Sequence, residues 1–210
     1  MPTQSEAAVR EAICRATRIL YERGHNAPLD GNVSARSGEG FLCTPSAVHK
    51  GQLAPSRVVR LSRDGVPLDR DTTPSSELAM HLAIYAARPD VAAIVHAHSP
   101  HAVALTVAGL NLEQLPIPEA ITAFGRIPTV PYASPTTTAL ADAVLPFARE
   151  LDAFILERHG PVCLGPSVDE ALWRLEVLEH TAKIVVLAHT LGGARPMPAD
   201  EVERLRPPRP

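Results

Sequence analysis

Hydrophobic and polar positions follow two different periods along this chain, and together they predict helices alternating with short strands. Apolar residues recur at helical spacing from Val9 to Leu20, through "TALADAVLPFARE", and in a long segment from Ser167 to Gly192. A helix is also predicted from about Ser76 to Ala87. Elsewhere the pattern is shorter: "DGNVSARSGEGFLCT" predicts a hairpin, and "APSRVVRLSRDGVPL" predicts a second one with Asp64-Gly65 at its turn.

Short apolar runs rich in β-branched residues predict buried strands at 91–95, at 127–130 and in "AFILERHG". Because hairpins are mixed with crossover helices, we expect an α/β fold: a single three-layer α/β/α domain, residues 1–193, around a central mixed, largely antiparallel sheet. Residues 194–210 are rich in proline, which excludes a regular helix throughout. We expect this Pro-rich C-terminal tail to be either loosely ordered or packed on a partner.

Composition and charge restrict the class of partner. Hydrophobic residues make up 45% and charged residues 20% of the chain, which is typical of a globular protein rather than a disordered or membrane one. The formal net charge is -3 without a stripe of Lys or Arg, so we expect no nucleic acid and no membrane partner, and instead a small molecule. The isolated Cys14, Cys43 and Cys163 suit neither a disulfide framework nor a thiolate zinc site, and with no export or anchor segment we expect a cytoplasmic protein.

The stretch "AIVHAHSPHA" places histidines directly after a predicted buried strand. Residues two apart on a strand point to one face, so His96 and His98 can converge on one metal ion if the chain stays extended through Ala97. The alternative is a pair of hydrogen-bonded histidines at a strand end, and His101 falls outside this pattern. His159, in "ILERHGPV", again stands where a buried strand gives way to a turn. Three histidines from two strands would complete an open, catalytic zinc site, whereas each alone also fits a core histidine.

A metal site for proton transfer also needs a base, and "PSSELAMH" offers Glu77. A glutamate in the first turn of a helix equally fits a capping role, with Ser75 or Ser76 as the N-cap. The free N–H groups and hydroxyls of a helix N-terminus also form an anion site. "GNVSAR" and "TPSAV" are small, polar and turn-like, so their backbone donors either line the same pocket or only form turns.

Four segments in order, "GNVSAR", "TPSAV", "SSELAMHLAIYAARPDVAAIVHAHS" and "ERHGPV", resemble the motifs of the class II aldolase and adducin-head family, which includes the fuculose-phosphate aldolases. The resemblance extends from about residue 5 to residue 193. It implies a divalent metal, usually Zn²⁺ with Mn²⁺ and Fe²⁺ as alternatives, bound by His96, His98 and His159. It also implies Glu77 as general acid/base, a sugar-phosphate substrate, and a homotetramer with its active site at a subunit interface. The phosphate-binding positions that it implies are Asn32, Ser46, Ala47, Ser75 and Ser76.

The activity that the resemblance implies is that of a zinc aldolase, which cleaves or forms a carbon–carbon bond of a small, phosphorylated ketose through a metal-stabilised enediolate. A decarboxylase, dehydratase or epimerase on the same metal site is the alternative, because members of the family reuse the stabilised enolate for other bond cleavages. A non-catalytic, adducin-like interaction domain is the third hypothesis. The complete set of His96, His98, His159 and Glu77 argues against it.

Two positions depart from the family's pattern. Ala47 stands where the family's phosphate loop usually has glycine, and its Cβ crowds the place where the backbone approaches the ligand. The tyrosine that the fuculose-phosphate aldolases contribute from a neighbouring subunit has no counterpart in "LPIPEAITAFG". Glu119 in that segment is either a second acid/base group, as in the family's dehydratase branch, or a surface carboxylate. Tyr132 in "VPYASP" is another candidate proton donor or a packing residue.

Overall fold

The central element of the fold is a mixed sheet. A computed structural model describes residues 5–69 and 72–206, and in these residues seven strands form one sheet in the order β3-β2-β1-β4-β7-β6-β5. Neighbouring strands are antiparallel except for the parallel pair of β5 and β6. This confirms the predicted mixed, largely antiparallel sheet. The strands are β1 (Asn32–Ser37), β2 (Gly40–Cys43), β3 (Val59–Leu61), β4 (Ala93–His96), β5 (Thr129–Val130), β6 (Ala153–Leu156) and β7 (Gly160–Gly165).

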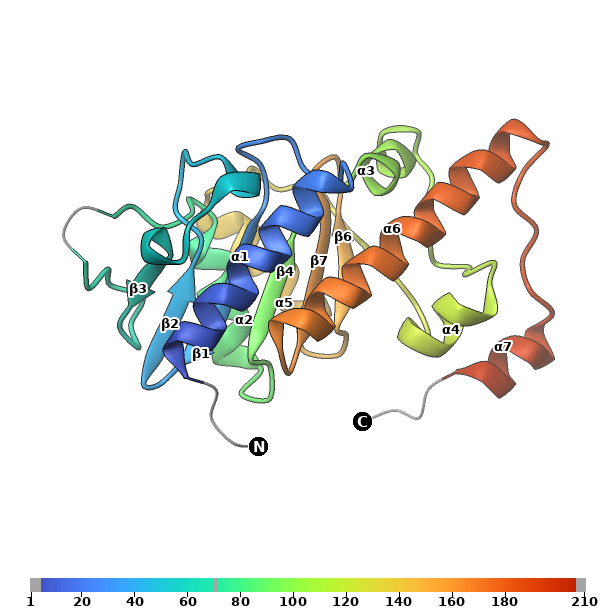
Figure 1. Cartoon of the computed structure of the whole chain (residues 1–210). Helices are drawn as coiled ribbons and strands as arrows, with labels where there is room; N and C mark the ends of the chain where they lie inside the picture. Colours follow the sequence, from blue (N-terminus) through green and yellow to red (C-terminus); the bar gives the residue numbers. More distant parts are fainter. Residues whose placement is uncertain (1–4, 70–71, 207–210) are drawn as a thin grey trace.

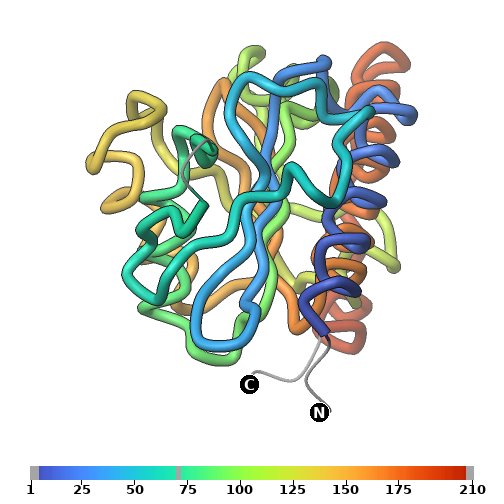
Figure 2. Tube along the Cα trace, turned by 60° about the vertical axis from the view of Figure 1, so that its left-hand side comes forward, coloured from blue at the N-terminus to red at the C-terminus, as the bar shows by residue number. Residues whose placement is uncertain are grey.

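Helices cover both faces of the sheet and produce three layers (Figure 1). One face carries α1 (Glu6–Glu22), α3 (Pro100–Val107), α4 (Pro118–Phe124), α6 (Val168–Thr190) and α7 (Ala199–Leu205), and the other carries α2 (Leu78–Ala87) and α5 (Thr138–Ala148). In Figure 2, α1 and α6 lie to the right of the strands and α2 lies to the left. None of the described helices is both long enough and apolar enough to cross a membrane.

Alternation along the strands divides the apolar side chains between two cores. On β4, Ala93 and Val95 belong to the core under α1 and α6, whereas Ile94 belongs to the core under α2 and α5. His96 follows Val95 in this alternation, so its side chain lies on the face that α2 covers. The alternation along β4 therefore places His96 on the side of the sheet where α2 begins, directly after Glu77.

Several helix and strand boundaries differ from the predicted ones; β4, for example, begins at Ala93 rather than at Val91. The α2 helix begins at Leu78 rather than Ser76, because the Ser75 N–H donates a hydrogen bond to the Thr44 carbonyl (3.0 Å) and keeps this part of the chain outside the helix. The β5 strand begins at Thr129, two residues later than expected. Before it, Ile127 makes an isolated bridge to a distant loop residue.

The second predicted hairpin is only partly formed. The Gly65 N–H donates to the Ser62 carbonyl at 3.0 Å, so the turn at Asp64-Gly65 is present. The returning arm pairs with β3 through an isolated bridge between Leu61 and Pro67, and Arg60 of β3 also forms an ion pair with Asp69 at 3.6 Å. Proline has no N–H to donate, so a regular ladder does not extend through this residue.

The described part of the C-terminal tail, which ends at residue 206, contains a short helix that packs within its own chain. The α7 helix forms within it and packs against α4, on the same chain. Met197, Val202 and Leu205 are partly buried against the core under α1 and α6. The prolines confine the helix to the seven residues from Ala199 to Leu205 rather than preventing it.

The three cysteines are buried and unpaired, as their isolated spacing predicts. Burial raises the pKa of Cys14 and of Cys43 to about 11. These thiols therefore stay protonated near neutral pH and do not resemble thiolate metal ligands or nucleophiles.

Candidate metal centre

His96 occupies the end of a central strand. It is opposite Asn32 of β1 on one side and Val162 of β7 on the other, and its side chain is completely buried. Its Nδ1 lies 2.8 Å from the Pro161 carbonyl oxygen, an acceptor, so Nδ1 carries the proton and Nε2 keeps a free lone pair. Burial, together with the nearby His159, lowers the pKa of His96 to about 3. The ring is therefore neutral at physiological pH, as a metal ligand must be.

His159 lies in the tight turn between β6 and β7. Arg158 before it has a φ of 59° and Gly160 after it a φ of 131°, so the chain reverses sharply at this histidine. A Cβ on Gly160 would lie 2.2 Å from the Ala97 carbonyl oxygen. Glycine therefore allows the hairpin to approach the segment between His96 and His98, and the ring centroids of His96 and His159 are 4.7 Å apart.

His98 lies just beyond β4 and is the most exposed of the three histidines, with 30% of its side chain accessible. Its ring centroid is 5.1 Å from that of His96 and 4.6 Å from that of His159. Burial and the two neighbouring histidines lower its pKa. Its Nδ1 lies 3.5 Å from Oδ2 of Asp30, a carboxylate that the sequence analysis did not single out.

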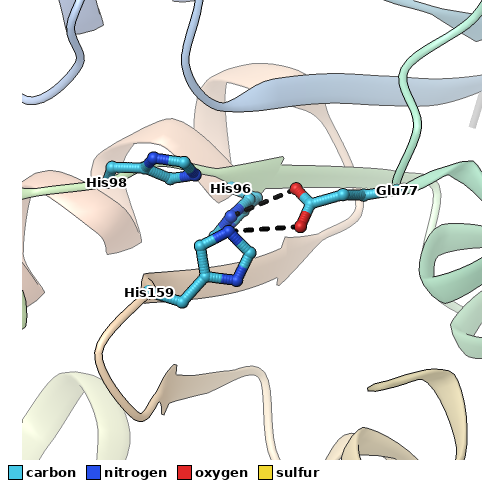
Figure 3. Close-up of side chains that lie close together, drawn as sticks. All are labelled: Glu77, His96, His98 and His159. Atoms are coloured by element: carbon cyan, nitrogen blue, oxygen red, sulfur yellow. Dashed lines mark ion pairs between the residues drawn. The ribbon is translucent and has the colours of Figure 1, made fainter. Parts of the chain in front are cut away.

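Glu77 precedes α2 directly and points its buried carboxylate at the histidines (Figure 3). Oε2 lies 3.3 Å from Nε2 of His96, and Oε1 lies 3.2 Å from Nε2 of His159. The Asn32 amide donates a hydrogen bond of 2.7 Å to Oε2. The structure thus brings together the four side chains in which the sequence predicts metal and acid/base chemistry.

The donor set fits a divalent metal ion. One ligand atom from each of Glu77, His96, His98 and His159 lies within 4.8 Å of the others. Because bonds to such ions are about 2.0–2.6 Å long, ligand atoms of one ion lie within about 5 Å of each other. Nε2 of His96 and Oε1 of Glu77 are also buried and make no hydrogen bond among the described residues, although buried polar atoms normally have a partner. A metal ion would satisfy both atoms.

The candidate phosphate-binding segments lie next to each other and next to Glu77. Pro45 and Pro74 form an isolated bridge, and the Ser46 N–H donates to the Thr73 carbonyl at 2.9 Å. Ser75 and Ser76 follow this bridge and lead into Glu77; Ser75 Oγ accepts a hydrogen bond from the Glu77 N–H at 3.3 Å. The Asn32 amide, in contrast, is bound to the Glu77 carboxylate.

Ala47 shows why glycine suits its position. Its φ is 53°, in the left-handed region that favours glycine. The chain therefore holds an alanine in a backbone conformation that glycine adopts more easily, with a methyl group added where the loop turns.

Glu119 and Tyr132 are not part of the cluster within their own chain. Glu119 is exposed on α4, which packs against α6 and α7 (Figure 1). Tyr132 is 59% exposed, and its N–H donates to Oε2 of Glu157 at 3.0 Å. Neither side chain contributes to the group of Glu77 and the three histidines.

Two buried polar residues beside the site escaped the sequence analysis. Asn26 Oδ1 accepts a hydrogen bond of 2.8 Å from the His98 N–H, and no periodic pattern marks this loop residue. His81 lies four residues after Glu77, and this spacing places both residues on one side of a helix. The spacing could therefore have pointed to His81 as a neighbour of the site. Its Nδ1 is 2.7 Å from Ser34 Oγ, and burial lowers the pKa of His81 to about 3.

Comparisons with known proteins agree with this geometry. Residues 11–186 match the sequence model of the Class II Aldolase and Adducin N-terminal domain. The chain is 40% identical over 184 residues to a 3-oxo-tetronate 4-phosphate decarboxylase of Cupriavidus necator, covering 86% of this chain and 84% of that protein. It is 34% identical to an L-fuculose phosphate aldolase of Haemophilus influenzae, covering 83% and 81%.

A solved structure gives the same result for the fold. The crystal structure of YgbL from Klebsiella pneumoniae superimposes with a TM-score of 0.87 and 34% identity, covering 97% of this chain and all of that one. The histidine and glutamate cluster, the sheet that carries it and the match over residues 11–186 lead to one conclusion. The chain belongs to the class II aldolase and adducin family, as an enzyme of the class II aldolase superfamily.

Proposed function

We propose that this chain is a metal-dependent decarboxylase that acts on a small 3-oxo acid carrying a phosphate, with 3-oxo-tetronate 4-phosphate as the first candidate. The observation that carries the proposal is the 40% identity to the Cupriavidus necator decarboxylase over 184 residues. The comparisons therefore favour the decarboxylase alternative over the aldolase that the sequence analysis placed first. Aldolase activity on a ketose phosphate is the second candidate, because an L-fuculose phosphate aldolase is 34% identical.

The two reactions share one intermediate, which explains how one site can serve either. In a 3-oxo acid, the bond between the carboxylate carbon and C2 lies next to the ketone. When this bond breaks, CO₂ leaves and the electron pair moves onto C2 and the ketone oxygen, and with a hydroxyl on C2 the product is an enediolate. Aldol cleavage of a ketose phosphate also leaves an enediolate. A bound divalent metal supplies Lewis-acid stabilisation of this negative charge.

His96, His98 and His159 would hold the metal ion. Three imidazoles with a nearby carboxylate suit Zn²⁺, which we propose as the metal, and they also suit Mn²⁺ and Fe²⁺. The hydrogen bond from His96 Nδ1 to the Pro161 carbonyl fixes the ring so that Nε2 faces Glu77 and the other histidines.

Glu77 is the group that moves the proton. After CO₂ has left, C2 needs one proton to become the hydroxymethyl carbon of the product, dihydroxyacetone phosphate. The Glu77 carboxyl group lies beside His96 and His159, and Asn32 orients it through its 2.7 Å hydrogen bond. Glu77 donates its proton to C2 and is protonated again from water.

The missing tyrosine supports decarboxylation over aldol cleavage. An aldolase must also transfer a proton at the hydroxyl group that becomes the aldehyde, and the resemblance assigns this role to a tyrosine absent from "LPIPEAITAFG". CO₂ needs no proton when it leaves. A decarboxylase therefore requires only the proton that Glu77 gives to C2, so a second acid/base group such as Glu119 can assist the reaction but is not essential to it.

Asn32, Ser75 and Ser76, together with the loop of Ser46 and Ala47, are the proposed phosphate site. Segments 45–47 and 73–76 lie side by side next to Glu77. Segment 73–76 leads into the N-terminus of α2, and a helix N-terminus favours a bound anion. Binding energy from the phosphate would hold the reacting carbon in the metal site.

Glu119 is proposed to act in the site of a neighbouring subunit. Within its own chain it is exposed on α4 and outside the metal cluster, so a role in acid/base chemistry requires a second copy. Such a role would need the homotetramer, with active sites at subunit interfaces, that the family resemblance implies. A cytoplasmic location is part of the same proposal.

The proposal is tested by incubating the zinc-loaded protein with 3-oxo-tetronate 4-phosphate. We expect release of CO₂ and formation of dihydroxyacetone phosphate, both measured by ¹³C NMR, and loss of both products after chelation and in Glu77→Gln. L-Fuculose 1-phosphate serves as the competing substrate in a parallel assay. Cleavage of the fuculose phosphate without CO₂ release from the 3-oxo acid would contradict the proposal and establish the aldolase alternative.

A further inference from the structure

The sheet ends before His98, which is the most exposed of the three histidines. In the pairing of β1 with β4, Asn32 lies opposite His96, and the same antiparallel register would place Asp30 opposite His98. However, β1 begins at Asn32, and Gly31 has a φ of 66°, so the chain turns away before that pair forms. The His98 N–H therefore has no strand residue as its partner in the described chain.

The side chain of Asn26 takes the place of the missing strand partner. Its Oδ1 accepts the hydrogen bond of the His98 N–H at 2.8 Å, and Asn26 is only 7% exposed. A Cβ on Gly31 would lie 2.4 Å from Nδ2 of Asn26 and 2.7 Å from the His96 carbonyl oxygen. The absence of a side chain at Gly31 thus lets the 26–31 loop pack directly against the end of β4.

Asn26 is itself anchored to the end of a helix. Its N–H donates to the Leu20 carbonyl at 3.3 Å, in the last turn of α1. On the other side of His98, the buried carboxylate of Glu179 accepts hydrogen bonds from the N–H groups of His101 and Ala102, at 2.9 Å each. The start of α3 is therefore fixed independently, and Asn26 holds the residue between this helix and the sheet.

We propose that Asn26 is a positioning residue for the metal centre: its side-chain oxygen fixes the main chain at His98 so that the imidazole meets His96 and His159 at one ion. His96 is held by strands on both sides and His159 by a tight turn, whereas the main-chain N–H of His98 is held by this amide. Without the oxygen, a partly buried N–H loses its partner and the main chain at His98 is released. The proposal rests on the metal site of the proposed function, and it does not depend on the substrate.

The test compares two variants of Asn26 by their zinc affinity, measured by competition with a chromophoric chelator. Asn26→Leu has a similar volume without the acceptor, and we expect it to bind zinc about 10- to 100-fold more weakly, the usual cost of losing a residue that orients a ligand. Asn26→Asp keeps the oxygen and should bind zinc nearly as well as the wild type. At saturating zinc, kcat of Asn26→Leu should return toward the wild-type value.

Two controls separate positioning from lost stability. Asn111→Leu removes an equivalent hydrogen bond, from the Glu113 N–H to Asn111 Oδ1 (3.1 Å), in an exposed loop. Ile13→Val destabilises the core at a completely buried residue of α1. Both controls should keep the zinc affinity of the wild type, while Ile13→Val lowers the melting temperature.

Distinct outcomes would overturn the inference. Unchanged zinc affinity in Asn26→Leu excludes the positioning role, and a parallel loss in Ile13→Val shows that affinity only follows stability. If Asn26→Leu does not fold, the shorter Asn26→Ser is measured in the same way, and wild-type affinity there also excludes the role. A wild-type protein that binds no zinc overturns the metal site and this inference together. A protein that binds zinc and decarboxylates nothing contradicts only the proposed substrate.

Discussion

The sequence predicts catalytic residues in two regions of this molecule. The fold brings the residues of one region together and leaves the residue of the other exposed. The first is the end of the sheet where β4 and the turn between β6 and β7 meet the start of α2, with Glu77, His96 and His159 within contact distance. The second is α4 with α7, where Glu119 is exposed. Strand register and a tight turn bring the first group together, whereas nothing within one chain brings Glu119 to it.

The two regions show that a single chain can position some functional residues precisely and others only loosely. Residues at the ends of paired strands have their place fixed by backbone hydrogen bonds on both sides, as His96 has between β1 and β7. A residue on a peripheral helix has its place fixed only by packing, and its exposed face is available to a second subunit. The predictions below test this contrast, from the largest expected effect to the smallest.

His96→Ala should have the largest effect. It removes the ligand at the centre of the cluster, whose side chain is completely buried between two strands. We expect loss of bound metal at micromolar concentrations, measured by elemental analysis, and loss of all decarboxylation. One equivalent of metal retained in this variant would contradict the assignment of the first region as a metal centre.

Glu77→Gln should keep the metal and lose the proton transfer. Glutamine retains an oxygen that can accept the hydrogen bond from Asn32 but holds no acidic proton, so we expect the turnover rate to fall roughly 10²- to 10⁴-fold. The measurement is the steady-state rate at saturating metal, beside the metal content of the same sample. A rate close to that of the wild type would exclude Glu77 as the proton carrier.

Glu119→Gln should lower the rate by less than about 10²-fold and leave the metal content unchanged, because the side chain lies outside the cluster of its own chain. Mixed oligomers sharpen the contrast. If Glu119 acts in a neighbouring site, refolding Glu77→Gln together with Glu119→Gln restores sites with both carboxylates, and part of the activity returns. No recovery in an oligomer with exchanged subunits would show that Glu119 acts within its own chain or not at all.

The buried histidines should make the metal-free protein sensitive to acid. The pKa of His81 is lowered by burial to about 3, below the value of about 6.5 in the unfolded chain, so the unfolded state binds more protons between these values. Stability is therefore complete above pH 6.5 and falls as the pH decreases toward 3, by about 1.4 kcal/mol per pH unit for each such histidine. Urea unfolding of His81→Gln at several pH values should show a slope smaller by this amount. An unchanged slope would mean that His81 is not buried as a neutral ring.

Ala47→Gly should have the smallest effect. The φ of 53° costs an alanine more than a glycine, so the substitution should stabilise the fold by about 1 kcal/mol in urea unfolding. Removal of the methyl group from the proposed phosphate loop should also lower KM for a phosphorylated substrate. A destabilised variant would show that the loop is not strained at this residue.

The same contrast explains how far the sequence predicted the structure. The hydrophobic run before His96 and the turn residues around His159 carried enough local information to predict two strand ends with a histidine at each. The four motifs in order then gave the family. Asn26 and Asp30 were missed because their places depend on the turn at Gly31 and on the register of β1, which no short pattern encodes. The α7 helix was missed because its seven residues lie among prolines and gain their burial only from distant elements.

The central claim is that Glu77 transfers a proton to an enediolate whose negative charge would be stabilised by a divalent metal ion held by His96, His98 and His159. The most direct measurement is exchange of a carbon-bound hydrogen of dihydroxyacetone phosphate in deuterated water, followed by NMR with the zinc-loaded protein. An enzyme that protonates this enediolate must also remove the proton again, so the account predicts exchange that disappears after chelation and in Glu77→Gln. A protein that holds one zinc ion per chain and catalyses no exchange would contradict the account.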